Sequence, residues 1–376
     1  MRIGILTLPL NANYGGLLQA YALQTVLERM GNEVVVFNRP LELDKVSLWK
    51  KPITYSKRII KKYLLKQPIL IFSEKPAYER EVIGRKYTQK FVDTYIHQYL
   101  IRHISDINAK DVDAIVVGSD QIWRMLYFKS MWDDKKAADA FLQFTKGWNI
   151  KRVSYAASFG LDYPELSKKE VITCKDALGH FDGISVREES GASICEKYFN
   201  IKAQWVLDPT MLLNATDYSN IIKEGNNPKE HILMSYILDE TPEIAKLREN
   251  IARAKGLRIK KANVSQRLDQ KEKFQPQPPL EDWLKAFDEA EYVINDSFHA
   301  CVFSILFHKQ FTVIGNKTRG MSRFQSLLKM FGLEDRLITD PKEYRELSDI
   351  DYNRVDQILS EKREESLSFL RKALGI

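Results

Sequence analysis

Cysteine is scarce in this sequence. The 376 residues include only Cys174, Cys195 and Cys301, and no pair of them has the spacing of metal ligands. The histidines show no such spacing either, and no ordered Ser-His-Asp set suggests a hydrolase. We therefore expect no metal site and no disulfide framework, and we expect the three thiols to be reduced and buried.

Long apolar runs are also missing. No segment reaches the roughly 18 to 20 apolar residues that a membrane-spanning helix needs. The run from Ile3 to Leu10 is short, polar residues follow it, and no small-residue cleavage site is present, so it lacks the features of a signal peptide. These absences predict a cytoplasmic protein that is at most peripheral to the inner face of a membrane.

Positive charge is in excess but dilute. The chain has 57 Lys and Arg residues against 50 Asp and Glu residues, which gives a formal net charge of +7. Such an excess suits anionic partners such as phosphates, acidic sugars or a membrane surface. Because the sequence has no dense Lys/Arg tract, zinc-finger spacing or RNP-like aromatic motif, we expect no nucleic-acid partner.

Short apolar runs separated by turns fill the first half of the chain. Ile3 to Leu8 has the length of a buried strand, Leu17 to Met30 has the apolar spacing of a helix, and Val34 to Phe37 is a second strand. The further strands expected in this half are 113–117, 152–156, 183–186 and 204–207. Each ends at small or polar residues, as strands do at the ligand-binding edge of a parallel sheet.

A second series of alternating strands and helices occupies the rest of the chain. The strands expected there are 231–238, 257–260, 292–295 and 311–314. We place the domain boundary in the polar stretch 210–228, which divides the chain into residues 1–212 and 213–376. The pattern predicts an α/β protein with two Rossmann-like domains facing across a cleft, as in GT-B glycosyltransferases. The final helix, about 360–374, is a candidate to pack back on the first domain.

Two glycines follow the first expected strand, in the segment Asn13-Tyr14-Gly15-Gly16. Glycine lets the backbone approach a ligand closely, and free N–H groups at the start of a helix can hold an anion. The segment matches neither the G-x-G-x-x-G nor the P-loop pattern. These four residues are candidates for substrate binding, and the alternative is a tight turn that only reverses the chain.

Polar residues also end two other strands of the first half. Asp120 could orient or deprotonate a sugar hydroxyl, and Trp123 could stack on a sugar face. Ser119 is a further candidate for substrate binding. The alternative is that Ser119 or Asp120 caps a helix. Arg187 follows a buried strand, and its guanidinium group suits a carboxylate or a phosphate. The alternative for Arg187 is an ion pair with the adjacent glutamates.

Asp296, Ser297 and His299 lie between a buried strand and a helix of the second half. Histidine titrates near neutrality and can give or take a proton. A lone histidine is more often structural, but its position at a strand end beside Asp296 and Ser297 favours a functional role. Asp296 and Ser297 are candidates for substrate binding.

Three cations, Lys317, Arg319 and Arg323, follow the last expected strand of the second sheet. Cations in a strand-to-helix loop can form an anion site. The alternative is a solvated basic loop.

The segment 57–64 has apolar residues on one helical face and basic residues on the other. We favour an ordinary surface helix that covers a core. Docking onto anionic lipid is the alternative.

Several segments in a fixed order resemble the polysaccharide pyruvyl transferase family over roughly residues 1–335. They are IGILTLPLNANYGGLLQAYALQ, DAIVVGSDQIW, SYAASFG, ISVREESG, VLDPTMLL and VINDSFHACVFSILF, and SRFQSLLKMFGLEDRL also fits. The resemblance implies transfer of a pyruvyl group from phosphoenolpyruvate to a hexose, forming a cyclic ketal. It implies an acceptor in a surface polysaccharide or in its polyprenyl-linked precursor. It implies no cofactor besides phosphoenolpyruvate as co-substrate.

The resemblance also implies roles for particular residues. The family's Asp, Arg and His fall on Asp120, Arg187 and His299. Where some members have an Arg two residues before the His, this sequence has Ser297, so the phosphate contact would come from Arg319 or Arg323.

In the implied reaction, His299 protonates the methylene group of phosphoenolpyruvate. Asp120 accepts a proton from the acceptor hydroxyl or orients it, and Arg187 with the 317–323 loop binds the anionic groups. Two alternatives stay open: a GT-B glycosyltransferase using a nucleotide sugar, and a non-catalytic glycan-binding protein.

Overall fold

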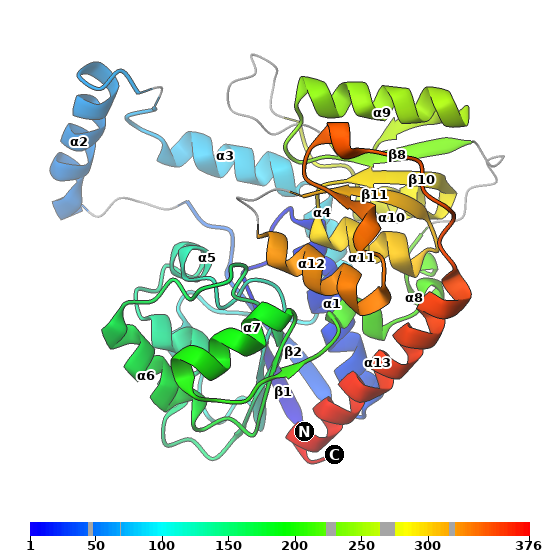
Figure 1. Cartoon of the computed structure of the whole chain (residues 1–376). Helices are drawn as coiled ribbons and strands as arrows, with labels where there is room; N and C mark the ends of the chain where they lie inside the picture. Colours follow the sequence, from blue (N-terminus) through cyan, green and yellow to red (C-terminus); the bar gives the residue numbers. More distant parts are fainter. Residues whose placement is uncertain (44–47, 68, 223–230, 264–274, 316–319) are drawn as a thin grey trace.

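The computed structural model describes residues 1–43, 48–67, 69–222, 231–263, 275–315 and 320–376. Two parallel sheets organise the chain (Figure 1). The first has the order β3-β2-β1-β4-β5-β6-β7, with β1 Arg2–Leu6, β2 Glu33–Asn38, β3 Gln98–Leu100, β4 Ala114–Val117, β5 Lys151–Ala157, β6 Gly183–Val186 and β7 Gln204–Trp205. The second has the order β12-β11-β10-β8-β9, with β8 Ile232–Tyr236, β9 Arg258–Lys261, β10 Ala290–Asn295, β11 Gln310–Ile314 and β12 Leu337–Ile338.

The central strands are apolar on both faces because helices cover both sides of a parallel sheet. All four residues of β4 are buried, and Ile5 of β1 pairs in register with Val36 on one side and Val116 on the other. The helices are α1 Tyr14–Arg29, α2 Lys51–Tyr63, α3 Glu74–Arg85, α4 Thr88–Tyr95, α5 Met125–Met131, α6 Lys168–Leu178, α7 Glu189–Ile194, α8 Ala215–Ser219, α9 Pro242–Lys255, α10 Leu280–Glu289, α11 Phe298–Leu306, α12 Met321–Phe331 and α13 Tyr352–Leu374. This arrangement confirms the predicted α/β class with two Rossmann-like, GT-B-like sheets.

Each sheet has a point where the strand order reverses. In the first sheet β1 lies between β2 and β4, and in the second β8 lies between β9 and β10. Open α/β sheets bind ligands outside the carboxyl ends of the strands at such points. The segments that leave β4 and β10 there are 118–120 and 296–299, so the fold brings both predicted polar motifs to the right edges.

The two halves of the chain share one continuous apolar core. The ring of Tyr14 in α1 contacts Trp283 of α10, with 5.4 Å between the ring centroids. Helix α13 returns to the first sheet and contacts β5 and β6. There Ser366 accepts a hydrogen bond from the N–H group of Leu207, and Arg363 donates to the carbonyl of Met211.

The predicted role of one helix is wrong. Helix α2, which contains most of the segment 57–64, has no buried residue, so it does not cover a core. The three cysteines are buried, as expected. Within the described ranges, no helix combines the length and the apolar character needed to cross a bilayer.

Candidate active site

His299 is the second residue of α11, directly beyond β10. Its ring lies against Gly15 in the first turn of α1, because a Cβ atom built on Gly15 would lie 1.9 Å from Nδ1 of His299. Gly15 therefore makes room for the imidazole. This contact between the two halves of the chain is a reason for a glycine that the sequence did not predict, since the two roles considered for it were ligand binding and a tight turn.

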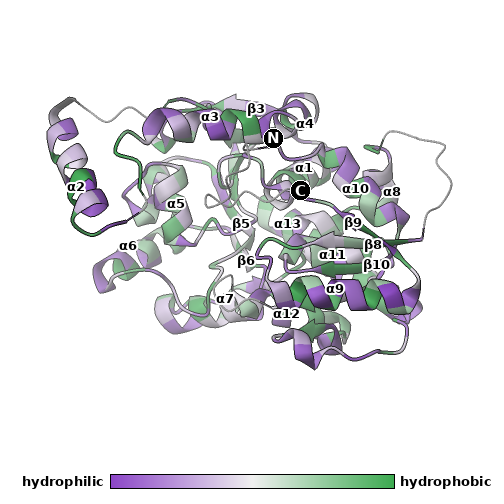
Figure 2. Ribbon diagram, turned by 90° about the horizontal axis from the view of Figure 1, so that it is seen from above, coloured by the Kyte–Doolittle hydropathy of each residue, from purple (hydrophilic) through white to green (hydrophobic). Residues whose placement is uncertain are grey.

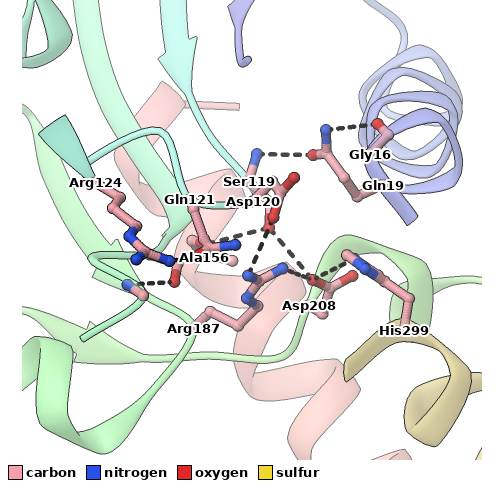
Figure 3. Close-up of polar contacts among 12 residues, drawn as sticks. Gly16, Gln19, Ser119, Asp120, Gln121, Arg124, Ala156, Arg187, Asp208 and His299 are labelled. Atoms are coloured by element: carbon pink, nitrogen blue, oxygen red, sulfur yellow. Dashed lines mark hydrogen bonds and ion pairs between the residues drawn. The ribbon is translucent and has the colours of Figure 1, made fainter. Parts of the chain in front are cut away.

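Asp208 joins the groups of this site, and the sequence analysis did not assign it (Figure 3). It follows β7 and is fully buried, and its Oδ2 lies 2.7 Å from Nη1 of Arg187 and 3.7 Å from Nε2 of His299. Its Oδ1 accepts hydrogen bonds from the N–H and the hydroxyl of Thr210. The signal that could have found Asp208 was its place at a strand end, within a segment that resembles the family.

The Asp208 carboxylate is stabilised in its charged form. Burial alone would raise its pKa, but the neighbouring His299 and the charge of Arg187 outweigh burial and hold the pKa well below its ordinary value. Asp208 therefore stays ionised at neutral pH and can stabilise a protonated His299.

Arg187 lies at the centre of three carboxylates. Besides Asp208 it contacts Asp120, with 3.4 Å between Nη2 and Oδ1, while its Nε is 4.0 Å from Glu188. Burial alone would lower the pKa of Arg187. The charges of Asp208, Asp120 and Glu188 raise this pKa by more than burial lowers it, so the net shift is upward. Glu188 also accepts hydrogen bonds from the hydroxyl of Ser158 at 2.8 Å and from the N–H of Phe159 at 3.0 Å. The alternative that the sequence left open, an ion pair with an adjacent glutamate, is present with Glu188 as the longest of the three contacts, while Glu189 pairs with Lys329.

A second arginine approaches from the other half of the chain. Arg323 lies in the first turn of α12, buried, with its guanidinium carbon 5.7 Å from the ring centroid of Phe298. The guanidinium carbon of Arg187 lies 4.4 Å from the same centroid. Burial and the charge of Arg187 lower the pKa of Arg323 to about 10, although Asp120 and Glu188 oppose this shift. The two guanidinium groups lie over the same ring and repel each other. An anion bound between them would reduce this repulsion.

Tight backbone contact supports the position of Arg323. Gly320 precedes α12 with φ +87°, and a Cβ atom built on it would lie 2.0 Å from the carbonyl oxygen of Gly160, in the loop after β5. The predicted Lys317 and Arg319 lie outside the described residues.

Asp120 lies beside the start of α1. Its Oδ2 is 3.7 Å from the position that a Cβ atom on Gly16 would occupy. Gly16 is half-buried, and Asn13 at the start of the helix is exposed. Ser119 is fully buried: its hydroxyl donates to the carbonyl of Ala156 and its N–H donates to Gln19. Ser119 therefore holds Asp120 in place, while Asn13 and Gly16 remain candidates for contact with a substrate.

Three predicted contacts with substrate are wrong. Trp123 is 1% exposed, stacks on Phe141 and donates its indole N–H to a carbonyl, so it belongs to the core and cannot cover a sugar. Tyr14 is equally buried and donates its hydroxyl to a carbonyl of the second half. The carboxylate of Asp296 accepts the N–H groups of Leu238 and Asp239, so it fixes the loop after β8.

Ser297 is half-buried at the start of α11, and its N–H donates to the side chain of Asn295. The described side chains thus bring together Asp120, Arg187, His299 and Arg323, which the sequence predicted, with Asp208, which it did not. Each of the five keeps only a few per cent of its surface exposed. His299 itself is 6% exposed, and one charged group, the Asp208 carboxylate, faces its Nε2 at 3.7 Å.

Solved structures with a similar course of the chain include UDP-GlcNAc 2-epimerase from Neisseria meningitidis bound to UDP-GlcNAc, at 8% identity and a TM-score of 0.47, covering 99% of this chain and 94% of that one. An alpha-glucosyltransferase in complex with UDP and DNA has 9% identity and a TM-score of 0.48, covering 99% and 95%. Heptosyltransferase WaaC from E. coli with ADP has 13% identity and a TM-score of 0.39, covering 96% and 100%. Similarity at this level carries no information about activity.

No curated protein matches the chain. The family model described as polysaccharide pyruvyl transferase matches residues 13–318, which is most of the sequence and includes four of the five side chains of the site. The chain therefore belongs to the polysaccharide pyruvyl transferase family.

Proposed function

We propose that the protein transfers the pyruvyl group of phosphoenolpyruvate to a hexose of a glycan, forming a cyclic ketal. The acceptor is a surface polysaccharide or its polyprenyl-linked precursor. The observation that carries the proposal is the pair of buried guanidinium groups of Arg187 and Arg323, which come from different halves of the chain and lie over one ring, that of Phe298. Phosphoenolpyruvate carries a carboxylate and a phosphate, and guanidinium groups suit both.

Arg187 and Arg323 supply the positive charge that an anionic donor needs, and three carboxylates lie beside them. Of the carboxylates around Arg187, Asp208 is engaged by Thr210 and Glu188 by Ser158. Burial and the charge of Arg187 lower the pKa of Arg323. An anion bound between the arginines would raise that pKa again.

His299 is the proposed general acid. The Asp208 carboxylate faces its Nε2 at 3.7 Å, while Nδ1 lies against the backbone of Gly15. His299 gives a proton to the methylene carbon of phosphoenolpyruvate, which makes the adjacent carbon electrophilic. Positioned proton transfer of this kind contributes roughly 10²–10⁴-fold to a rate.

Asp120 is the proposed base. It takes the proton of one acceptor hydroxyl as that oxygen attacks the electrophilic carbon. A second hydroxyl of the same sugar then displaces phosphate and closes the ketal, and its proton leaves with the phosphate. The proton held by Asp120 is released to solvent, from which His299 regains the proton it gave. Arg187 contacts Asp120 at 3.4 Å and so orients this carboxylate.

The test measures phosphate release and the pyruvyl mass gained by an acceptor glycan. We expect His299→Ala to fold and to lose at least about 10²-fold in kcat. The matched control is His308→Ala, because His308 also pairs with an aspartate, at 2.9 Å from Asp356, but on the surface. Full turnover by the His299 variant would remove the assignment.

Calorimetry separates the other activities. The proposed reaction requires binding of phosphoenolpyruvate, weakened in Arg323→Gln. Binding of UDP or GDP without phosphoenolpyruvate would instead indicate a glycosyltransferase, and glycan binding without phosphate release would indicate a non-catalytic protein.

A further inference from the structure

Helix α2 stands away from the two sheets (Figures 1 and 2). None of its residues is buried, although its neighbours in the chain hold it in one place. Arg58 donates to Glu74 and to the carbonyl of Ile71, and the ring of Tyr55 lies 4.8 Å from that of Phe72. The helix is therefore supported on one side only, by the segment that follows it.

The apolar side chains of α2 form a continuous exposed face. Ile53 and Ile60 are seven residues apart and thus lie on the same side of the helix, 61% and 49% exposed. Tyr63 and Leu64 extend this face at the end of the helix, 66% and 75% exposed, and Trp49 precedes it at 91%. Amphipathic helices normally bury such a face against a core, and exposed apolar patches mark interaction sites.

Basic residues flank this face, and the segment that carries them has no carboxylate of its own. From residue 45 to residue 73 the chain contains no Asp or Glu and eight basic residues, namely Lys45, Lys50, Lys51, Lys57, Arg58, Lys61, Lys62 and Lys66. On the helix, Lys57 and Lys61 are exposed. This concentration contrasts with the whole chain, where the two signs nearly balance at 57 against 50. The partner of this face must therefore be negatively charged as well as apolar.

We infer that α2 docks onto an anionic membrane surface. The face of Ile53, Ile60 and Leu64 enters the boundary between headgroups and acyl chains, and Lys57 and Lys61 contact lipid phosphates. A helix with a strongly basic flank, bulky apolar residues on the other face and no core to cover matches the physics of interfacial helices. The inference uses no residue of the active site and does not depend on the proposed reaction.

The experiment is co-sedimentation of the full chain with vesicles. One set of vesicles is phosphatidylcholine alone, and the other contains equal parts of phosphatidylcholine and phosphatidylglycerol. We expect binding to the anionic vesicles only, weaker at higher ionic strength. Lys61→Glu with Lys62→Glu weakens binding by about tenfold or more, since each cation near an anionic surface contributes substantially. Ile53→Ser weakens it several-fold by removing part of the inserted face.

Matched controls lie on another helix. Lys168→Glu with Lys169→Glu makes the same charge change on two exposed adjacent lysines of α6, and Ile172→Ser changes an isoleucine that is 71% exposed. These variants keep wild-type binding, and all variants keep the wild-type Tm because none alters a buried side chain. Equal binding to both kinds of vesicle, no binding at all, the same loss in the controls, or self-association through α2 in place of lipid binding would overturn the inference.

Turnover with a water-soluble acceptor separates this inference from the proposed function. The α2 variants keep that turnover if only docking is lost. A chain that docks but never forms a ketal would refute the reaction and leave the docking intact.

Discussion

Replacing Asp208 by Asn tests whether one buried carboxylate organises the site. The substitution keeps the shape of the side chain but replaces one oxygen by an NH₂ group. If that group faces Arg187, two donors oppose each other across the 2.7 Å contact. If it is turned the other way, it faces the N–H of Thr210, which now donates to Oδ1 at 3.0 Å. No orientation of the amide satisfies both neighbours.

The magnitude follows from burial. Asp208 and Arg187 both have almost no exposed side chain, so the variant leaves a buried guanidinium without its closest counter-charge. Breaking a buried pair from one side destabilises a protein by about 3–5 kcal/mol. With an unfolding entropy of about 2.1 cal/mol/K per residue over 376 residues, this corresponds to a Tm lower by roughly 4–6 °C.

The effect has a defined pH dependence. The folded pKa of Asp208 lies below its unfolded value of about 3.9, so its contribution to stability is present above that pH and is lost as the pH falls through the folded pKa. The difference in Tm between wild type and Asp208→Asn is therefore constant around neutrality and shrinks in acid.

Thermal unfolding followed by circular dichroism measures the change in Tm, and phosphate release measures kcat and KM. Because Asp208 positions His299 and Arg187 and does not react itself, we expect kcat to fall more than KM changes. The control is Asp176→Asn, which breaks an ion pair of similar length, 3.0 Å to Lys146, between exposed side chains. A Tm equal to that of the wild type, or equal losses in the two variants, would refute the reasoning.

Three further changes probe the parts that surround the site. Gly15→Ala should lower kcat by about 10²-fold, because its Cβ atom would displace the ring of His299; an active variant would show that the ring can move freely. Tyr14→Phe should lower the Tm by about 1–2 °C by leaving a carbonyl of the second half without its hydroxyl partner, and an unchanged melt would argue against this contact. The bond from Lys129 lowers the pKa of Glu170 to about 2, so Glu170→Gln should lower the Tm at neutral pH, with a deficit that shrinks as the pH falls from about 4.5 towards 2; a deficit independent of pH would contradict this.

The sheets were predictable because buried parallel strands are nearly continuous apolar runs, and a strand such as Ala114–Val117 has no other plausible structure. The positions of Asp120 and His299 at strand ends were predictable for the same reason. Asp208 was not predicted, because its importance comes from partners 21 and 91 residues away. The core position of Trp123 depends on Phe141 and Phe159, whose approach no local pattern reveals.

The site exists only because the two halves of the chain are held together. Arg187 and Asp208 follow strands of the first sheet, whereas His299 and Arg323 follow strands of the second, and the ring of Phe298 lies beside both arginines. The first turn of α1 both holds the two halves together and shapes the site. Tyr14 packs on the second half, and Gly15 makes room for the ring of His299. A shift of about 1 Å between reacting groups can lower a rate by 10²-fold. Contacts that fix one half against the other therefore control the chemistry as directly as the charged residues do, although they touch no substrate.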